Sequence, residues 1–174
     1  MKALVVYESM FGNTQSVARS ISRRLVRHLR VQMASVDDAP SPAREAFDLV
    51  VVGESTHAFS RSRPLTRKDA VTKEATGSGP GTGLGEWLAD FPQASDGRLV
   101  ARLDTRIEKV RHLPGSAARN ATEVADQLSY RAAAPPKSFY MADTTGLLVD
   151  GESGRAEAMG GTTWFGGEFP PPGR

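Results

Sequence analysis

The amino-acid sequence predicts one α/β domain in which a parallel sheet carries helices on both faces. Short apolar runs of strand length alternate with segments whose apolar residues recur at helical spacing. Residues 48–53 (DLVVVG) contain four consecutive apolar residues, which is typical of a strand buried on both faces at the centre of a parallel sheet. The 174 residues suffice for a single core, and no linker or internal repeat divides them.

The first part of the chain is predicted to contain three strands. Residues 2–7 (KALVVY) form a nearly continuous apolar run, residues 31–36 (VQMASV) alternate, and residues 48–53 are the buried run. A short helix near residues 43–46 precedes the third strand. A longer amphipathic helix follows the first strand, with apolar residues at every fourth position: Val17, Ile21, Leu25 and Leu29.

The second part of the chain begins with a mostly irregular, glycine-rich segment at residues 54–86. The elements predicted to follow this segment are a helix at 86–91, a strand at 98–103, a helix at 115–128, a strand at 138–142 and a weak helix at 152–159. Residues 1–160 would form the domain. Residues 161–174, rich in glycine and proline, are expected to be a disordered tail.

The composition excludes several kinds of chemistry. The chain has no cysteine, which removes disulfides, iron–sulfur clusters and thiol nucleophiles. His28, His57 and His112 lie on separate segments without a carboxylate at ligand spacing, so no metal site is predicted. No apolar run approaches the roughly 20 residues of a membrane span. A strand beginning at Lys2 leaves no room for a signal peptide, and we expect a cytoplasmic protein.

Positive charge is concentrated in the first predicted helix. The formal net charge is +2, yet no acidic residue occurs between Gln15 and Val36, a segment with five arginines: Arg19, Arg23, Arg24, Arg27 and Arg30. These arginines either form a docking face for an acidic partner or nucleic acid, or are a solvated face whose side-chain stems cover apolar surface. The second interpretation is favoured. Nucleic acid is disfavoured because no aromatic residues alternate with the arginines.

The turn between the first strand and the first helix has the features of a phosphate site. The first N–H groups of a helix have no intrahelical partner and lie at the positive end of its dipole. Ser9 and Thr14 can add hydroxyl donors and Asn13 an amide, and Gly12 permits close backbone approach or a positive φ angle. The turn lacks the lysine of a Walker site and the glycines of a dinucleotide fingerprint. It suits a phosphate monoester, or it is a capped helix start closed by Asn13 or Thr14.

The segment Ser9-Met10-Phe11-Gly12-Asn13-Thr14 is similar to the phosphate loop of flavodoxins, usually Ser/Thr-x-Thr-Gly-x-Thr, with Phe11 in place of the central threonine. The longer phrase VVYESMFGNTQSVA also resembles flavodoxin-domain proteins. The resemblance covers roughly residues 1–160. It implies a three-layer flavodoxin-like domain, with a five-stranded parallel sheet of order 2-1-3-4-5. FMN would bind between the first and third strands.

The same resemblance implies two loops that hold the isoalloxazine ring. The first follows the third strand and would cover one face of the ring: Ser55, Thr56, His57, Ala58 and Phe59. The second follows the fourth strand and would cover the other face: Asp104, Thr105 and Arg106. All three loops would then lie at the carboxyl ends of their strands, around one crevice.

The sequence departs from the family in its aromatic residues and its charge. Flavodoxins commonly place the ring between a tryptophan and a tyrosine. Here Phe59 or His57 could supply one face, and Ile107 or Arg106 stands where the second aromatic residue is expected. Arg106 could stabilise the negative charge of reduced flavin, or be an exposed arginine that pairs with Asp104 or with solvent. Electron-carrier flavodoxins are strongly acidic, whereas this chain is not, which favours a different partner.

The sequence therefore predicts an FMN-binding redox protein, which passes electrons to a partner protein or reduces a small acceptor such as a quinone. The alternative is a degenerate flavodoxin-like module that has lost the flavin and acts in binding or regulation. A phosphorelay receiver is excluded because the third strand ends in Gly53-Glu54 and no lysine follows Ala142. The sequence determines neither the partner nor the oligomeric state.

Overall fold

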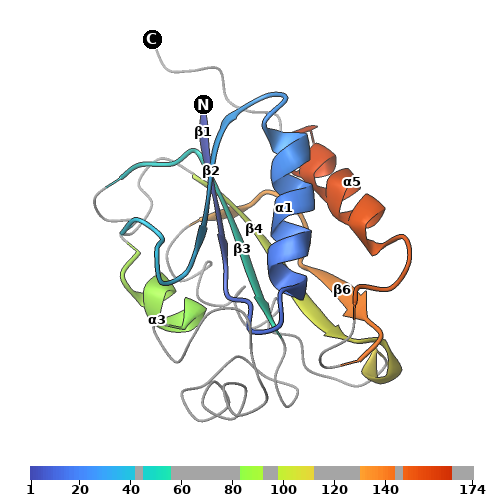
Figure 1. Cartoon of the computed structure of the whole chain (residues 1–174). Coiled ribbons are helices and arrows are strands. Elements are labelled where there is room, and N and C mark those ends of the chain that lie inside the picture. Colours follow the sequence, from blue (N-terminus) through green and yellow to red (C-terminus); the bar gives the residue numbers. More distant parts are fainter. Residues whose placement is uncertain (42–44, 56–82, 92–97, 112–129, 144–146, 166–174) are drawn as a thin grey trace.

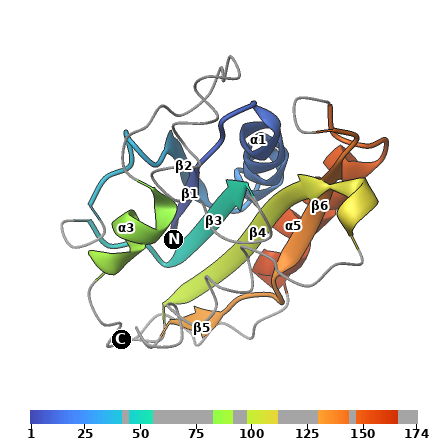
Figure 2. The same ribbon diagram turned by 90° about the horizontal axis from the view of Figure 1, so that it is seen from below.

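A parallel sheet separates two layers of helices in the computed structural model (Figure 1). The structure describes residues 1–41, 45–55, 83–91, 98–111, 130–143 and 147–165. Helices α1 (Asn13–Leu25) and α5 (Glu152–Phe165) lie side by side on one face of the sheet. Helix α3 (Leu84–Ala89) covers the other face (Figure 2). The helices thus cover both faces, as predicted.

The sheet has the strand order β2-β1-β3-β4-β5, and β6 also pairs with β4. All these pairings are parallel, which confirms the predicted order 2-1-3-4-5. The strands are β1 (Lys2–Tyr7), β2 (Arg30–Ser35), β3 (Leu49–Ser55), β4 (Leu99–Ile107), β5 (Arg131–Ala132) and β6 (Lys137–Met141).

The fifth position of the sheet is shared by two short strands, whereas the sequence predicted one. Strand β5 pairs with the start of β4 and β6 with its end. Between the pairs Val100↔Ala132 and Leu103↔Lys137, β4 advances three residues and the edge segment advances five. The extra length contains the proline pair at 135–136. Proline has no N–H to donate to a sheet, so pairing stops there and resumes after it.

Side chains of the strands alternate between two apolar cores. The core under α1 and α5 contains Val5, Val51, Leu103 and Phe139 from the strands, and Ile21, Leu25, Ala156 and Met159 from the helices. The core under α3 contains Leu4, Val50, Val52 and Val100 with Trp87, Leu88 and Phe91. Strand β3 contributes to both and is buried throughout, which confirms its predicted central position.

The prediction that the fourth strand ends at Leu103 is wrong. Strand β4 continues to Ile107 because β6 pairs with it over that stretch. The sequence after Leu103 begins with charged residues. In the structure these charged side chains are themselves buried. Asp104, Thr105 and Arg106 are therefore strand residues and not a loop.

The last helix is longer than predicted, since α5 extends to Phe165 and does not stop at Met159. Gly160 lies where α5 crosses α1, and a Cβ atom there would lie 2.8 Å from the backbone oxygen of Ile21. Glycine, a poor helix former, here permits close packing of two helices. The glycine-rich segment, the predicted helix at 115–128 and residues 166–174 lie outside the described residues, as does most of the predicted helix at 43–46.

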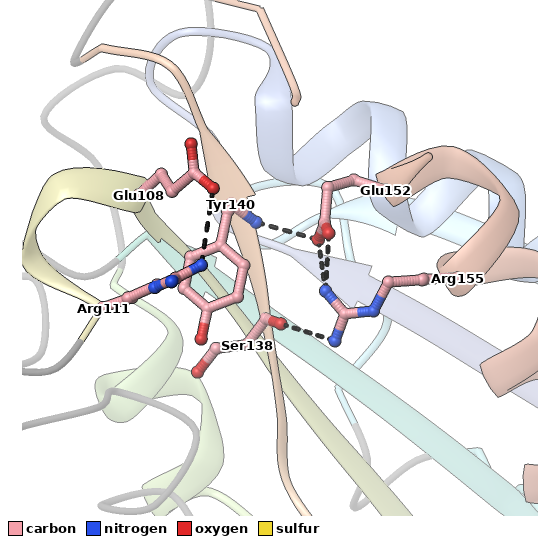
Figure 3. Close-up of polar contacts among 6 residues, drawn as sticks. All are labelled: Glu108, Arg111, Ser138, Tyr140, Glu152 and Arg155. Carbon is pink, nitrogen blue, oxygen red and sulfur yellow. Dashed lines mark hydrogen bonds and ion pairs between the residues drawn. The ribbon is translucent and has the colours of Figure 1, made fainter. Parts of the chain in front are cut away.

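The outer edge of β6 is closed by the start of α5 (Figure 3). The carboxylate of Glu152 accepts a hydrogen bond from the backbone N–H of Tyr140 at 2.9 Å. Arg155 donates to both oxygens of that carboxylate at 2.6 and 2.7 Å, and to the carbonyl of Ser138 at 3.4 Å. The same view shows the Glu108–Arg111 ion pair, 3.7 Å, where the 3₁₀ helix η1 (Glu108–Val110) follows β4. Covered in this way, the edge is a poor template for another strand.

No helix in the described part of the chain is both long and apolar enough to cross a membrane.

Candidate functional site

The turn between β1 and α1 leaves the start of the helix without a side-chain cap. Gly12 is the N-cap residue, with φ 84° and ψ −15°, in the left-handed region that favours glycine. Asn13 and Thr14 are the first residues inside α1 and not its cap, and the first turn contains no acidic residue. The positive end of the helix dipole therefore meets no carboxylate from its own first turn, which suits an anion.

The side chains of this turn are mostly buried, with Ser9 and Met10 inside and Phe11 half-buried. The backbone N–H of Glu8 donates to the carbonyl of Gly53 at 2.8 Å, which ties the turn to the end of β3. The amide Nδ2 of Asn13 lies 3.3 Å from the sulfur of Met141 on β6. The predicted phosphate loop is thus attached to other strands at both of its ends.

Three hydroxyl groups meet beneath the start of α1. The Thr14 oxygen lies 2.9 Å from that of Ser55 and 2.8 Å from that of Thr105. Thr105 donates to Ser55 at 3.4 Å. We call these three residues the hydroxyl cluster. They come from α1, β3 and β4, so the structure brings together one residue from each of the three predicted flavin-binding segments.

Charged side chains occupy the opposite face of the sheet at the same end. Alternation along the strands directs them toward the α3 side, and each is at most 5% exposed: Glu8, Glu54, Arg102, Asp104 and Arg106. We call these five residues the charged layer. The Glu8 carboxylate accepts a hydrogen bond from the backbone N–H of Leu84 at 2.9 Å and so holds the start of α3. Charges buried to this extent are stable only when they are paired or hydrogen-bonded.

Sequence reasoning found only two members of the charged layer, Asp104 and Arg106. It missed Glu8, Glu54 and Arg102, although the alternation Arg102, Asp104, Arg106 within a strand pattern could have indicated a charged face. Among the described residues, no three or more His, Asp or Glu side chains are grouped so that they could hold a metal ion.

The predicted ring-binding residues are only partly described. Ser55 ends β3, whereas Thr56, His57, Ala58 and Phe59 lie outside the described residues. Thr105 faces α1, and its neighbours Asp104 and Arg106 belong to the charged layer on the other side. The prediction of a loop at 104–106 is wrong, because pairing with β6 keeps these residues in the sheet. Their role in binding a cofactor remains a prediction.

Solved structures match most of the chain. One is a flavodoxin from the domain Archaea, with 20% identity and a TM-score of 0.62 over 92% of this chain and 94% of that one. The chain has the flavodoxin-like fold. Flavodoxin 2 from Bacillus cereus matches with 16% identity and a TM-score of 0.68, over 96% of this chain and all of that one. The Flv1 flavodiiron core from Synechocystis sp. PCC6803 matches at 14% identity and a TM-score of 0.59, over 95% of this chain and 36% of that one.

The sequence matches no protein-family model and no curated protein. At identities of 20% and below, the likeness to solved structures establishes the fold alone. In a flavodoxin-like sheet, ligands bind outside the carboxyl ends of the strands, where the strand order reverses between β1 and β3. The turn at Gly12 and the hydroxyl cluster lie at that place.

Proposed function

We propose that this chain binds FMN and transfers electrons through it. The observation that carries the proposal is the start of α1, which lacks a side-chain cap and follows the left-handed Gly12 at the β1/β3 switch point. A helix start of this kind offers backbone N–H donors and a positive dipole end to a phosphate. The flavodoxins among the matching structures support the same cofactor.

The residues present fit the phosphate group of FMN. The phosphate would lie against the turn at Ser9–Thr14, where neutral donors and backbone N–H groups meet no first-turn carboxylate. The ring would extend toward the ends of β3 and β4, near Ser55–Phe59 and Asp104–Arg106. When bound, the flavin supplies the redox chemistry. The protein's own residues anchor the phosphate, orient the ring and provide nearby charge, with Arg106 as the proposed cation.

The electron acceptor in this proposal is a partner protein or a small molecule such as a quinone. The basic segment gives only limited support for an acidic docking partner. Arg24 packs on α5, where its Nε atom would lie 3.3 Å from a Cβ placed at Gly161. Arg23 pairs with Glu157 across the same two helices at 3.4 Å. Part of the positive charge therefore serves helix packing. A cytoplasmic location, motivated by the absence of cysteine, is part of the proposal.

Titration of the purified protein with FMN and with riboflavin tests the proposal. We expect FMN to bind with a change in flavin absorbance and fluorescence, and more tightly than riboflavin, which lacks the phosphate. FMN at about 100 times its Kd should raise the free energy of unfolding by about 2.7 kcal/mol. If saturating FMN changes neither the spectrum nor the melting temperature, the proposal is wrong and the flavin-free module is the better interpretation.

A pair of glycine substitutions localises the site. Gly12 and Gly151 have φ angles of 84° and 87°, and an added Cβ would contact nothing within 4 Å at either position. Alanine should therefore cost each position a similar left-handed strain of about 1–2 kcal/mol. We expect Gly12→Ala to weaken FMN binding about tenfold, and Gly151→Ala to leave it unchanged. Equal effects of the two substitutions on FMN affinity would contradict a phosphate site at the β1/β3 junction.

A further inference from the structure

The hydroxyl cluster joins the three segments that the proposed function places around FMN. Thr14 is in the first turn of α1, Ser55 is the last residue of β3, and Thr105 is near the end of β4. The exposed fractions of the three residues are 0%, 8% and 0%. These segments are distant in sequence, and the cluster supplies direct side-chain hydrogen bonds among all three.

The space for this cluster depends on a glycine. A Cβ atom at Gly53 would lie 3.2 Å from Cγ2 of Thr14 and 2.8 Å from Cδ1 of Leu103. The absence of a side chain lets the start of α1 approach β3 closely. The hydrogen bond from the Glu8 N–H to the Gly53 carbonyl holds the turn against the same residue. The Thr14 side chain therefore packs directly against β3 at Gly53.

Two of the three hydrogen-bonding positions of the Thr14 hydroxyl are used inside the protein. A hydroxyl has one donor and two acceptor positions, and the Thr14 oxygen has hydroxyl neighbours at 2.8 and 2.9 Å. The residue is fully buried. The backbone N–H groups at the start of the helix can bind an anion without any movement of this buried hydroxyl.

We propose that Thr14, Ser55 and Thr105 are positioning residues, which hold the phosphate turn in register with the ends of β3 and β4. The inference has two parts. The first part is that the three hydroxyls stabilise the protein cooperatively in the absence of ligand. The second part, their effect on flavin binding, rests on the proposed function.

A double-mutant cycle in the absence of flavin tests the first part. Loss of a buried hydrogen bond of about 1.4 kcal/mol corresponds to a factor of ten, so we expect Thr14→Val and Thr105→Val each to raise the unfolding constant about tenfold in urea titrations. Because the two residues share a contact, the double variant should exceed either single variant by clearly less than tenfold, with a coupling of about threefold or more. Strictly multiplicative effects would overturn the proposal.

Ser22→Ala is the matched control for removing a buried hydroxyl from α1. Ser22 is buried on the same helix, and its Oγ atom has no hydrogen-bond partner among the described residues. Its removal should change the unfolding constant by less than about threefold. Thr105→Ser keeps the hydroxyl that Thr105→Val removes, so it should keep the contact with Thr14 and leave the unfolding constant closer to that of the wild type than Thr105→Val does. Failure of this rescue would show that the methyl contacts, and not the hydroxyls, join the three segments.

Affinities for FMN and riboflavin test the second part. A positioning role predicts that Thr14→Val weakens both flavins by the same factor, so that the ratio of their Kd values stays at the wild-type value. A direct phosphate contact predicts a loss for FMN alone, which would overturn the proposal. If the wild-type protein binds neither flavin, the proposed function fails, and the double-mutant cycle still decides whether the hydroxyl cluster couples the three segments.

Discussion

Gly53→Ala is the substitution for which the structure makes the sharpest prediction about stability. Gly53 is buried in β3, between β1 and β4, and its backbone carbonyl accepts the hydrogen bond from Glu8. An added methyl group would lie 2.8 Å from Cδ1 and 3.1 Å from Cγ of Leu103, and 3.2 Å from Cγ2 of Thr14. All of these distances are shorter than the roughly 3.5–4.0 Å that two carbon atoms prefer.

The magnitude follows from what must move. Leu103 is 1% exposed and Thr14 fully buried, so neither side chain can swing into solvent. Adding a methylene to a packed core costs about 1–3 kcal/mol, and replacing glycine by alanine in a strand offsets about 0.5–1 kcal/mol through the unfolded chain. Taken at their midpoints, these two terms leave a net loss of about 1 kcal/mol. For a domain of this size that corresponds to a fall in Tm of about 2–4 °C.

Thermal and urea unfolding measure the effect, with Gly154→Ala as the control of opposite sign. Gly154 is exposed in the first turn of α5, and a Cβ there would contact nothing within 4 Å. Alanine should therefore stabilise that helix, by less than about 1 kcal/mol. Because Gly53→Ala also displaces Thr14, it should weaken FMN and riboflavin together. A Gly53→Ala protein as stable as the wild type would refute the close packing of α1 on β3.

Two further substitutions test the charged layer and the closed edge of the sheet. Arg102→Met should lower the free energy of unfolding in urea by about 3–5 kcal/mol, because it leaves buried carboxylates without a balancing charge. Arg131→Met on exposed β5 should change it by less than about 0.5 kcal/mol. Similar values for the two variants would contradict the burial of the charged layer. Glu152→Ala should cost about 1–3 kcal/mol because Tyr140 loses the acceptor for its N–H. Glu157→Ala, which removes only an exposed ion pair with Arg23, should cost less than about 0.5 kcal/mol. Equal losses in Glu152→Ala and Glu157→Ala would show that the contact of Glu152 with Tyr140 stabilises the protein no more than a surface ion pair does.

The sequence predicted the architecture well because local patterns carry most of that information. The buried run at 48–53 indicated the central strand, and the repeat of apolar residues after Gly12 indicated α1; both are observed. The resemblance of residues 9–14 to a phosphate loop implied the strand order, which the sheet confirms. Of the two roles that the sequence left open for Gly12, close backbone approach or a positive φ angle, the structure shows the positive φ.

The site was predicted less completely, because its side chains depend on partners far away in the sequence. Asp104–Arg106 were expected in a loop, since nothing local showed that β6 would pair with them. Thr14, Ser55 and Thr105 were assigned to three separate flavin-binding segments, and nothing local indicated that their hydroxyls would contact one another, as they do in the structure. Residues 56–59, also predicted to contact the ring, lie outside the described part of the chain.

The sequence by itself determined the alternation of strands and helices, the central place of β3 and the glycine turn that precedes α1. Each of these depends on periodicity or on the conformational freedom of a single residue, which neighbouring residues reveal. Only the tertiary structure decided that Glu8, Glu54 and Arg102 are buried in one charged layer, and that three hydroxyls meet under the turn. Burial and hydrogen bonding are properties of pairs of distant segments, and they exist only once the sheet has brought those segments together.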